Sequence, residues 1–320
     1  LDRVMGVIVS GRSIGTYTCA LDGDYDLHCW GKLDGSGPTL RPRRMEGVPK
    51  LARLAPAYRV DNDLMVTLGM GRDGRVTLQE VPGISRPKVI EQNYYNTCVI
   101  DGSNQLFCLG YDNYGCVGSG KRWRYIPVKI NQLDPVSHVT VGHEHTCARR
   151  FADGEVFCWG GNAQLTSEAH VRRGLQADSG ARNHHPPTWA GPSLALATGA
   201  THSCLIRPDH RLRCWGDGYD ATEVFTLGTD LQPDQISVGN QHNCAVADGR
   251  VWCWGSNEYG QLGSGDIQGS SPPATVQGPT AVVELSAGGD HTCALTETGL
   301  LWCWGDNRFG QLGTSGLETG

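Results

Sequence analysis

Cysteine is the residue type whose number and spacing in this chain point most directly to a chemistry. The 320 residues include 13 cysteines, which suits either disulfide bonds in an oxidising compartment or metal binding. A structural zinc site needs close pairs such as Cys-x2-Cys, and no two cysteines lie that close. The spacing therefore favours disulfides, with reduced core cysteines as the alternative. The predicted pairs are Cys19–Cys29, Cys98–Cys108, Cys147–Cys158, Cys204–Cys214, Cys244–Cys253 and Cys293–Cys303.

The segment around Cys244 shows how such a pair can meet. Asp248-Gly249 is a two-residue signal for a type I′ turn, because Gly adopts the positive φ that this turn needs. Counting outward from the turn pairs Cys244 with Cys253 across an antiparallel hairpin. Facing Cα atoms there lie about 4.5 to 5.5 Å apart, within the range that a disulfide tolerates. Turn-forming residues occupy the midpoint of the other pairs as well, so we predict six crosslinked hairpins.

Cys116 is the cysteine left over. It lies where two other copies of the pattern have the Gln of GQLG, and it has no partner in its own hairpin. We predict a buried and unreactive thiol, with an intermolecular disulfide as the alternative.

Histidine and aspartate offer two further candidate metal sites. Histidines that recur just before a cysteine could form a metal ring, but their place in a repeat favours a structural hydrogen bond to the backbone. These histidines are His145, His202, His242 and His291. Asp22, Asp24 and Asp26 have the spacing that begins a calcium loop, but the Gly and the distal Glu are missing. We predict a polar turn there and no metal site.

Several classes of function lack support in the sequence. The chain contains no Gly-x-Ser-x-Gly, no Walker loop and no His-Glu-x-x-His, so we predict neither an enzyme nor a cofactor. A net charge of -6 gives no overall basic field for nucleic acid. No apolar run approaches the 18 or so residues of a membrane span, so we expect no membrane insertion.

The hairpins are part of a longer repeat. An apolar strand precedes each one, and a Gly-rich tail follows, often after Trp-Gly. A cysteine-free copy is predicted between the first two pairs, with a strand at Leu51 to Leu54, a turn at Asp61 to Asp63 and a strand at Met65 to Gly69. Seven units then recur about every 46 residues, a period that suits a propeller.

We therefore predict an all-β fold, a seven-bladed β-propeller with four-stranded antiparallel blades. Residues 1–320 would form this single domain, with a degenerate second blade near residues 51–80 and an insertion at residues 163–189 in the fourth. Leu1 to Met5 is expected to join the last blade as a strand and so remove an exposed edge.

The motifs HTCAL, CWG and GQLG resemble the repeats of the regulator of chromosome condensation family. The resemblance is strong in residues 244–263 and 293–313 and weak in residues 51–78. It implies a seven-bladed propeller that binds proteins through one rim or face, in a family that ranges from nucleotide-exchange factors to β-lactamase inhibitors. The paired cysteines are more similar to secreted, disulfide-crosslinked members, which implies an extracellular, cell-surface or periplasmic location.

Two segments depart from the repeat, and we place the candidate partner-binding residues there. One is the insertion, which is long enough to be either functional or disordered, and the other is the KRWRY segment. Exposed aromatic and arginine side chains dominate many protein interfaces. The candidates are Trp123, Arg124, Tyr125, Arg172, Arg173, His184, His185 and Trp189.

The predicted function is a non-catalytic extracellular scaffold that binds a protein partner through loops on a propeller face. One alternative is a module that binds glycans or cell walls. The other is a guanine-nucleotide exchange factor for a small GTPase, which would require a reducing compartment.

Overall fold

The computed structural model describes strands from one end of the chain to the other. The described residues are 1, 3–10, 17–32, 39–45, 57–60, 64–70, 76–80, 84, 87–92, 96–112, 115–118, 123–131, 133–143, 145–160, 192–216, 218–219, 224–227 and 230–314. Within these ranges the regular elements are all β-strands, and no helix there is long and apolar enough to cross a membrane. The all-β prediction is confirmed.

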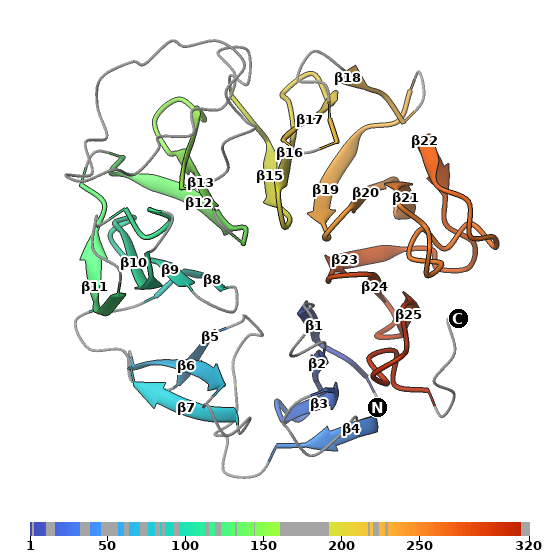
Figure 1. The fold of residues 1–320 in the computed structure, drawn as a ribbon, viewed down its shortest axis with the longest axis horizontal. Helices are drawn as coiled ribbons and strands as arrows, with labels where there is room; N and C mark the ends of the chain where they lie inside the picture. Colours follow the sequence, from blue (N-terminus) through green and yellow to red (C-terminus); the bar gives the residue numbers. More distant parts are fainter. Residues whose placement is uncertain are drawn as a thin grey trace.

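The described strands form seven antiparallel sheets of three or four strands, each built from consecutive strands. The first three sheets are β1 (Gly6–Ser10), β2 (Tyr17–Leu21), β3 (Leu27–Gly31) and β4 (Thr39–Arg44); β5 (Ala57–Val60), β6 (Leu64–Met70) and β7 (Val76–Glu80); and β8 (Val89–Gln92), β9 (Asn96–Ile100), β10 (Leu106–Tyr111) and β11 (Trp123–Lys129). The next two are β12 (Val136–Val141), β13 (His145–Arg150) and β14 (Val156–Gly160); and β15 (Ala195–Thr198), β16 (His202–Ile206), β17 (Leu212–Gly216) and β18 (Val224–Phe225). The last two are β19 (Pro233–Val238), β20 (His242–Ala247), β21 (Arg250–Gly255) and β22 (Ser270–Thr275); and β23 (Val282–Ala287), β24 (His291–Thr296) and β25 (Leu301–Gly305). Figure 1 shows the sheets arranged in a ring, with the first beside the last.

The predicted hairpins and their registers are confirmed. Asp248 and Gly249 have φ values of 50° and 69°, so both central residues of the turn adopt the positive φ of a type I′ turn. Cys244 pairs with Cys253 in the ladder between β20 and β21. The other five cysteine pairs face each other in the same way.

All six predicted disulfides are present. In each of them the two Cα atoms lie 4.1 Å apart. A crosslink between neighbouring strands restricts the unfolded chain, because it closes a loop that would otherwise be free. The disulfides therefore stabilise individual sheets, and other contacts must hold the sheets to one another.

Apolar side chains fill the space between neighbouring sheets. The Trp of the Trp-Gly motif is buried at Trp30, Trp159, Trp215, Trp254 and Trp304. Trp304, for example, packs in one cluster with Val246 and Leu262 of the preceding sheet and its following loop. These aromatic side chains are therefore core residues.

Polar side chains cover the edges of the strands nearest the centre of the ring. The Thr198 amide donates a hydrogen bond to Thr140 Oγ1 of the preceding sheet. The Ala287 amide donates to Ser237 Oγ at 2.8 Å, and the Val9 amide donates to Ser286 Oγ. An unpaired row of backbone groups at a sheet edge is open to association with other chains. Here one sheet supplies acceptors for the edge of the next.

The predicted role of Leu1 to Met5 is wrong. In the described residues this segment forms no strand, and the sheet β23–β25 has three strands. Val4 is buried in a cluster with Val7 and Leu295, and its amide donates to the carbonyl of Gly299 at 3.2 Å. Val4 therefore anchors the segment beneath the turn between β24 and β25, away from the edge of β25.

The prediction of four strands in every blade is also not met, because the described sheets contain three or four. In the cysteine-free copy, β6 contains the predicted strand Met65 to Gly69, whereas the predicted strand at residues 51–54 and turn at 61–63 lie outside the described residues. The predicted insertion at residues 163–189 lies outside them too. Beyond it, Pro192 forms a bridge with Glu155 at the edge of β14.

The disulfide assignment predicts the number of thiols. In the native, unreduced chain, twelve cysteines are paired and Cys116 is free. We expect one alkylated cysteine after denaturation without reductant, at Cys116, and thirteen after reduction. Intact-protein and peptide mass spectrometry would measure both. Three or more alkylated sites without reductant would contradict the assignment.

Candidate functional site

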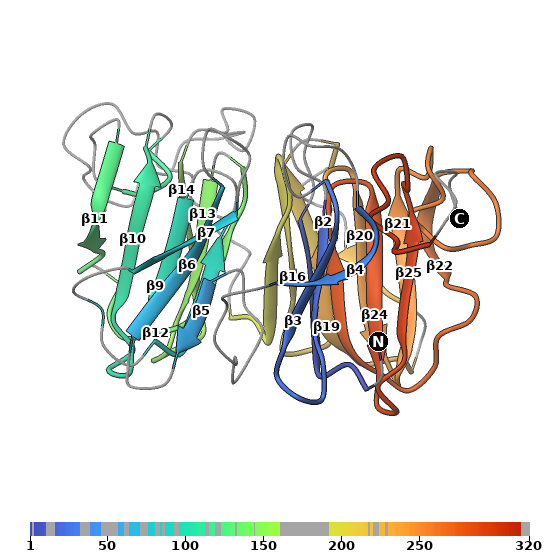
Figure 2. The same ribbon diagram turned by 90° about the horizontal axis from the view of Figure 1, so that it is seen from below.

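One face of the ring carries the connections that follow the third strand of each sheet. Because the sheets are antiparallel and run in the same order, β3, β10, β21 and β25 all end there. We call it the loop face; its described residues include Lys32, residues 115–118, 256–269 and 306–314. The hairpin turns with the crosslinked strands lie on the opposite face, the turn face. Figure 2 shows the ring edge-on, with the strands running between these faces.

The repeated histidines join four of the sheets to the sheet that follows. Nε2 of His145 hydrogen-bonds Ser203 Oγ at 2.8 Å, and each of the others reaches the residue at the same position one sheet further on. The remaining pairs are His202 with Asn243 Oδ1, His242 with Thr292 Oγ1 and His291 with Thr18 Oγ1. The structural role predicted for the histidines is confirmed. The predicted acceptor is wrong, because the partner is a side chain of the next sheet and not the backbone.

The hydrogen bonds fix the protonation of these imidazoles. The Thr18 hydroxyl donates to the carbonyl of Gln311 at 2.6 Å, so it must accept its bond from His291. Nδ1 of His242 and of His291 has no hydrogen-bond partner among the described atoms, which fits a neutral ring with its proton on Nε2. Burial lowers the pKa of His242 to about 3, with His291 and His202 adding to the effect, and lowers that of His291 to about 4.

Glycine three residues before the histidine makes room for the ring. A Cβ on Gly239 would lie 2.2 Å from Cε1 of His242, and one on Gly288 would lie 2.6 Å from Cε1 of His291. The amide of each glycine also donates to the carbonyl of its histidine at 2.8 Å. The glycine and the histidine of Gly-x-x-His therefore pack directly against each other, and a larger residue in place of the glycine would clash with the imidazole.

The main-chain carbonyl of the GQLG glutamine forms a second link between sheets. The carbonyl of Gln261 accepts from Trp304 Nε1 at 2.9 Å and from Thr292 Oγ1 at 3.2 Å. The carbonyl of Gln311 binds Trp30 and Thr18 in the same way, and that of Cys116 binds Trp159 and Thr146. Each of these carbonyls is thus paired twice with the following sheet.

This link explains why Cys116 can replace the glutamine. The interaction between the sheets uses the backbone carbonyl, which any residue supplies. The thiol itself is buried and accepts a hydrogen bond from Asn96 Nδ2. Burial, with the nearby Asp112, raises the pKa of the thiol to about 12. The prediction of a buried thiol is confirmed, and its burial opposes bonding to another molecule.

Cations and aromatic rings alternate on the loop face. The Arg308 guanidinium lies 4.2 Å from the ring centroid of Tyr259, in the preceding sheet's loop, and Nε and Nη2 bind the carboxylate of Asp306 at 2.9 and 3.0 Å. Lys32 Nζ lies 5.0 Å from the ring of Phe309 in the same manner. Cation–π contacts of this kind contribute about 0.5 to 1 kcal/mol where exposed. They hold side chains from different loops in fixed positions.

An acidic side chain borders this array. Burial raises the pKa of the Asp290 carboxyl, and the nearby Asp306 raises it further, while Arg308 and the Asn240 hydrogen bond lower it. This part of the loop face thus presents aromatic, cationic and anionic side chains close together.

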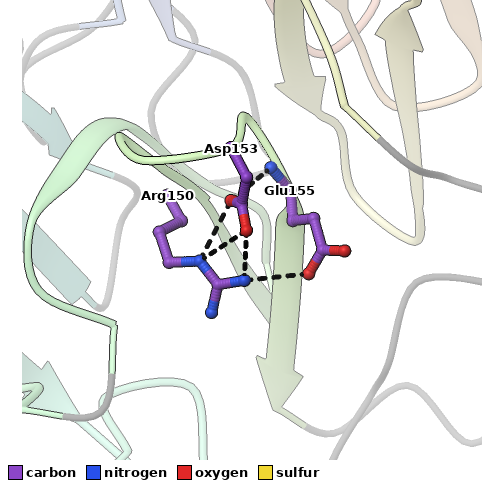
Figure 3. Close-up of polar contacts among 3 residues, drawn as sticks. All are labelled: Arg150, Asp153 and Glu155. Carbon is purple, nitrogen blue, oxygen red and sulfur yellow. Dashed lines mark hydrogen bonds and ion pairs between the residues drawn. The ribbon is translucent and has the colours of Figure 1, made fainter.

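The turn face carries ion pairs that are local to single hairpins. Nε of Arg150 binds both oxygens of Asp153 at 3.0 and 3.1 Å, and its Nη2 reaches Glu155 at 3.0 Å (Figure 3). The hydrogen bond from Arg150 lowers the pKa of the Asp153 carboxyl. Exposed pairs of this type contribute about 0 to 1 kcal/mol. They shape the turn between β13 and β14.

The aspartates with calcium-like spacing also form a turn. Oδ1 of Asp22 accepts from the amides of Asp24 and Asp26, and Oδ2 pairs with His28 Nε2 at 2.8 Å. Burial acts to raise the pKa of Asp22, but these hydrogen bonds outweigh it and the pKa is lowered. Across the described part of the chain, no group of three or more His, Cys, Asp or Glu could hold a metal ion.

The predicted partner-binding residues are only partly located. The backbone of Trp123 and Arg124 pairs with Tyr111 and Gly110 at the loop-face end of β10, and Tyr125 follows in β11. The other five, Arg172, Arg173, His184, His185 and Trp189, lie outside the described residues. Sequence reasoning missed Tyr259 and Phe309, although an aromatic residue directly before GQLG in two repeats was a usable signal.

Sequence comparison identifies the repeats. Models of the regulator of chromosome condensation (RCC1) repeat match residues 103–149 and 248–295, and a second such model matches residues 136–164, 234–261 and 282–311. The chain is 26% identical over 276 residues to the ultraviolet-B receptor UVR8 of Arabidopsis thaliana, covering 75% of this chain and 60% of UVR8. It thus spans less than two thirds of that relative.

Solved structures show the same fold. Human WBSCR16 matches with a TM-score of 0.75 at 16% identity, over 92% of this chain and 88% of that one. Yeast RCC1 (Prp20), in a structure bound to Kap60, matches with a TM-score of 0.62 at 15% identity, over 99% and 73%. The fold is therefore that of the RCC1 propellers. The chain itself carries regulator of chromosome condensation repeats, as its motifs predicted.

The neutral histidines predict loss of stability in acid. Unfolded histidine titrates near pH 6.5, whereas His242 and His291 have folded pKa values of about 3 and 4. The unfolded state therefore binds more protons between about pH 4 and 6.5, so the free energy of unfolding is highest above pH 6.5 and falls as the pH falls. Each histidine contributes a slope of up to about 1.4 kcal/mol per pH unit. Urea unfolding over a pH series would measure it.

A histidine-to-asparagine variant tests this slope. Asparagine is chosen because sheet β8–β11 has this residue at the position where four other sheets have the histidine. His242→Asn should reduce the slope of the unfolding free energy against pH by about the contribution of one histidine. His210→Asn is the control, because His210 lies in a turn with φ of 61°, which Asn tolerates. Equal slopes for wild type and His242→Asn would show that His242 does not remain neutral.

The indole hydrogen bonds predict a difference between two tryptophans. Trp304 Nε1 donates to Gln261, whereas Trp252 Nε1 has no hydrogen-bond partner among the described residues. Trp304→Phe should therefore cost about 0.5 to 1.5 kcal/mol more than Trp252→Phe. Chemical denaturation of both variants would test this, and equal losses would mean that the bond contributes nothing.

Proposed function

We propose that the chain is a closed seven-bladed propeller that serves as a non-catalytic scaffold and binds a protein partner through its loop face. Residues 1–320 would form this single domain. The proposal is for an oxidising location, at the cell surface, in the extracellular space or in the periplasm. No cofactor takes part.

The cation–aromatic array on the loop face is the observation that carries the proposal. Tyr259, Arg308 and Phe309 are residue types that dominate binding energy at protein interfaces. Their side chains are already held by contacts between loops, so little conformational entropy is lost when a partner binds. The exposed apolar side chain Ile267 lies in the adjoining loop.

Part of the remaining predicted site lies at the same face. Trp123, Arg124 and Tyr125 begin β11 at its loop-face end, and the chain leaves β14 at the loop-face end of that strand before the predicted insertion. We propose that Arg172, Arg173, His184, His185 and Trp189 extend the partner-binding surface. Protein binding is also a property of a structural neighbour, since yeast RCC1 has been solved bound to Kap60.

The disulfides support the proposed location. Eleven of the twelve paired cysteines are buried, and disulfides persist mainly outside the cytosol. A guanine-nucleotide exchange factor would work in a reducing compartment, so this alternative would gain if the cysteines were reduced in the native protein. Glycan binding stays an alternative that a carbohydrate array would test.

Three forms of the chain would test the loop face in a crosslinking pull-down from intact cells. The baits are wild type, Tyr259→Ser/Phe309→Ser on the loop face, and Arg150→Ser/Phe151→Ser on the turn face. We expect wild type and the turn-face variant to capture the same partner, and the loop-face variant to capture at least about tenfold less, the loss expected for hot-spot residues. Matching unfolding temperatures for the three baits would exclude misfolding. Undiminished capture by the loop-face variant would place the site elsewhere.

A further inference from the structure

Three arginines lie on one side of the hairpin formed by β16 and β17. Arg207 and Arg211 face each other at the turn, where the Arg207 amide donates to the carbonyl of Arg211 at 2.9 Å. Arg213 pairs with Leu205 two residues further along the ladder. Residues two apart on a strand, and residues directly opposite each other, share a face of the sheet. We call Arg207, Arg211 and Arg213 the arginine cluster.

This side of the hairpin looks toward the preceding sheet. Leu205, which shares the face with the arginines, packs in one cluster with Val156 and Cys158 of β14. Closer to the turn the hairpin is open to solvent, because Arg211 is exposed and the side chain of Arg207 is 31% exposed. The arginine cluster therefore lies at the turn-face end of the boundary between two sheets, where a ligand in solution can reach it.

The positive charge of the cluster is poorly balanced. Asp209 is the one carboxylate in residues 202–216, all of which the structure describes. Its Oδ1 lies 3.5 Å from Arg207 Nε, which has no hydrogen-bond partner among the described atoms, and it also accepts from the Arg211 amide. Burial lowers the pKa of the Arg213 guanidinium, and the charges of Arg207 and Arg211 lower it further, against the effect of Asp209. The three guanidiniums thus repel one another.

The preceding sheet shows a balanced version of the same arrangement. Arg150 stands at the first of the three positions and binds Asp153 and Glu155. Its guanidinium also lies 4.8 Å from the ring centroid of Phe157. Glu155 and Phe157 occupy the second and third positions. The arginine cluster therefore has cations at the places where its neighbour has the partners of a cation.

The other crosslinked hairpins have different residue types at these positions. In chain order they are Asp22, Asp26 and His28; Asp101, Gln105 and Phe107; Ala247, Arg250 and Trp252; and Thr296, Leu300 and Trp302. Among these six described hairpins, only that of β16 and β17 carries three arginines. The fold of the repeat therefore does not require them.

We propose that the arginine cluster binds sulfate or phosphate ester groups of an anionic polysaccharide. A guanidinium presents a planar fork of N–H donors that fits such oxyanions and forms charge-assisted hydrogen bonds with them. Anionic groups spaced along one polymer would meet guanidiniums on both strands and offset the repulsion between them. The cluster lies on the turn face, so this binding is independent of the protein partner proposed for the loop face.

The size of the cluster favours a polysaccharide over other polyanions. Basic clusters that recognise anionic lipids have about four to eight cations, and DNA-binding proteins make about six to ten phosphate contacts. The cluster has three cations in a chain of net charge -6. A short stretch of a sulfated or phosphorylated glycan is a ligand that three guanidiniums can satisfy.

Binding of fluorescently labelled dextran sulfate to the unreduced chain, measured by anisotropy, tests the proposal. We expect dextran sulfate to bind and unsulfated dextran of the same length not to bind. Sodium sulfate should displace the polymer more effectively than sodium chloride at the same ionic strength, because the site is built for a tetrahedral oxyanion. The opposite pattern, with equal displacement by the two salts, would indicate a general electrostatic attraction.

Replacing the whole cluster with glutamine gives the decisive variant, Arg207→Gln/Arg211→Gln/Arg213→Gln. Its affinity for dextran sulfate should fall at least about tenfold, because charge-assisted hydrogen bonds are lost. The slope of log affinity against log salt concentration should decrease by about one for each arginine that no longer contacts an anion.

Arg41→Gln/Arg43→Gln/Arg250→Gln is the matched control, since it removes the same charge at exposed positions of β4 and β21. It should change affinity and salt slope much less than the cluster variant, and matching unfolding temperatures would exclude misfolding of either. The proposal is overturned if dextran sulfate does not bind, if unsulfated dextran binds equally well, if sulfate competes no better than chloride, or if both variants lose affinity equally.

Discussion

The need to pair buried polar atoms between neighbouring sheets is the constraint on which this fold depends. A buried carbonyl or imidazole without a partner costs about 1 to 3 kcal/mol, and the ring buries one of each at several sheet boundaries. The histidine of one sheet and the GQLG carbonyl of its loop both bond to the following sheet, at Thr292 in one case and Thr18 in another. Apolar packing around the tryptophans brings the sheets together, and these directional bonds fix their relative position.

Local features were predictable from the sequence because local residues determine them. A two-residue turn and equal numbers of residues on both sides set the register of β20 and β21. The partners of the histidines were beyond such counting, since His291 and Thr18 are 273 residues apart. The sequence of Leu1 to Met5 is compatible with a β-strand. In the structure, however, Val4 packs into the apolar cluster around Val7 and Leu295, and tertiary packing of this kind overrides a short strand pattern.

The candidate site was predicted from departures from the repeat, and that criterion selected Trp123 and its neighbours, whose role stays a prediction. It overlooked Tyr259 and Phe309 because they lie inside the repeat. These two residues became candidates through contacts between loops, such as Arg308 over Tyr259, which no single repeat contains. In a repeat protein the variable positions within the motif can therefore be as informative as insertions, because neighbouring repeats bring them together.

The bonds between sheets also have a direction, from donor to acceptor around the ring. The sheets of His202, His242 and His291 each carry a histidine on one side and, on the other, the acceptor for the histidine of the preceding sheet, so the contact is a head-to-tail association of unlike surfaces. Such a contact gives a closed ring only when the rotation between units matches their number, and otherwise it continues as an open assembly. A fragment with fewer sheets would end in one free donor surface and one free acceptor surface that fit each other. Truncated forms of this chain would consequently be prone to assemble end to end.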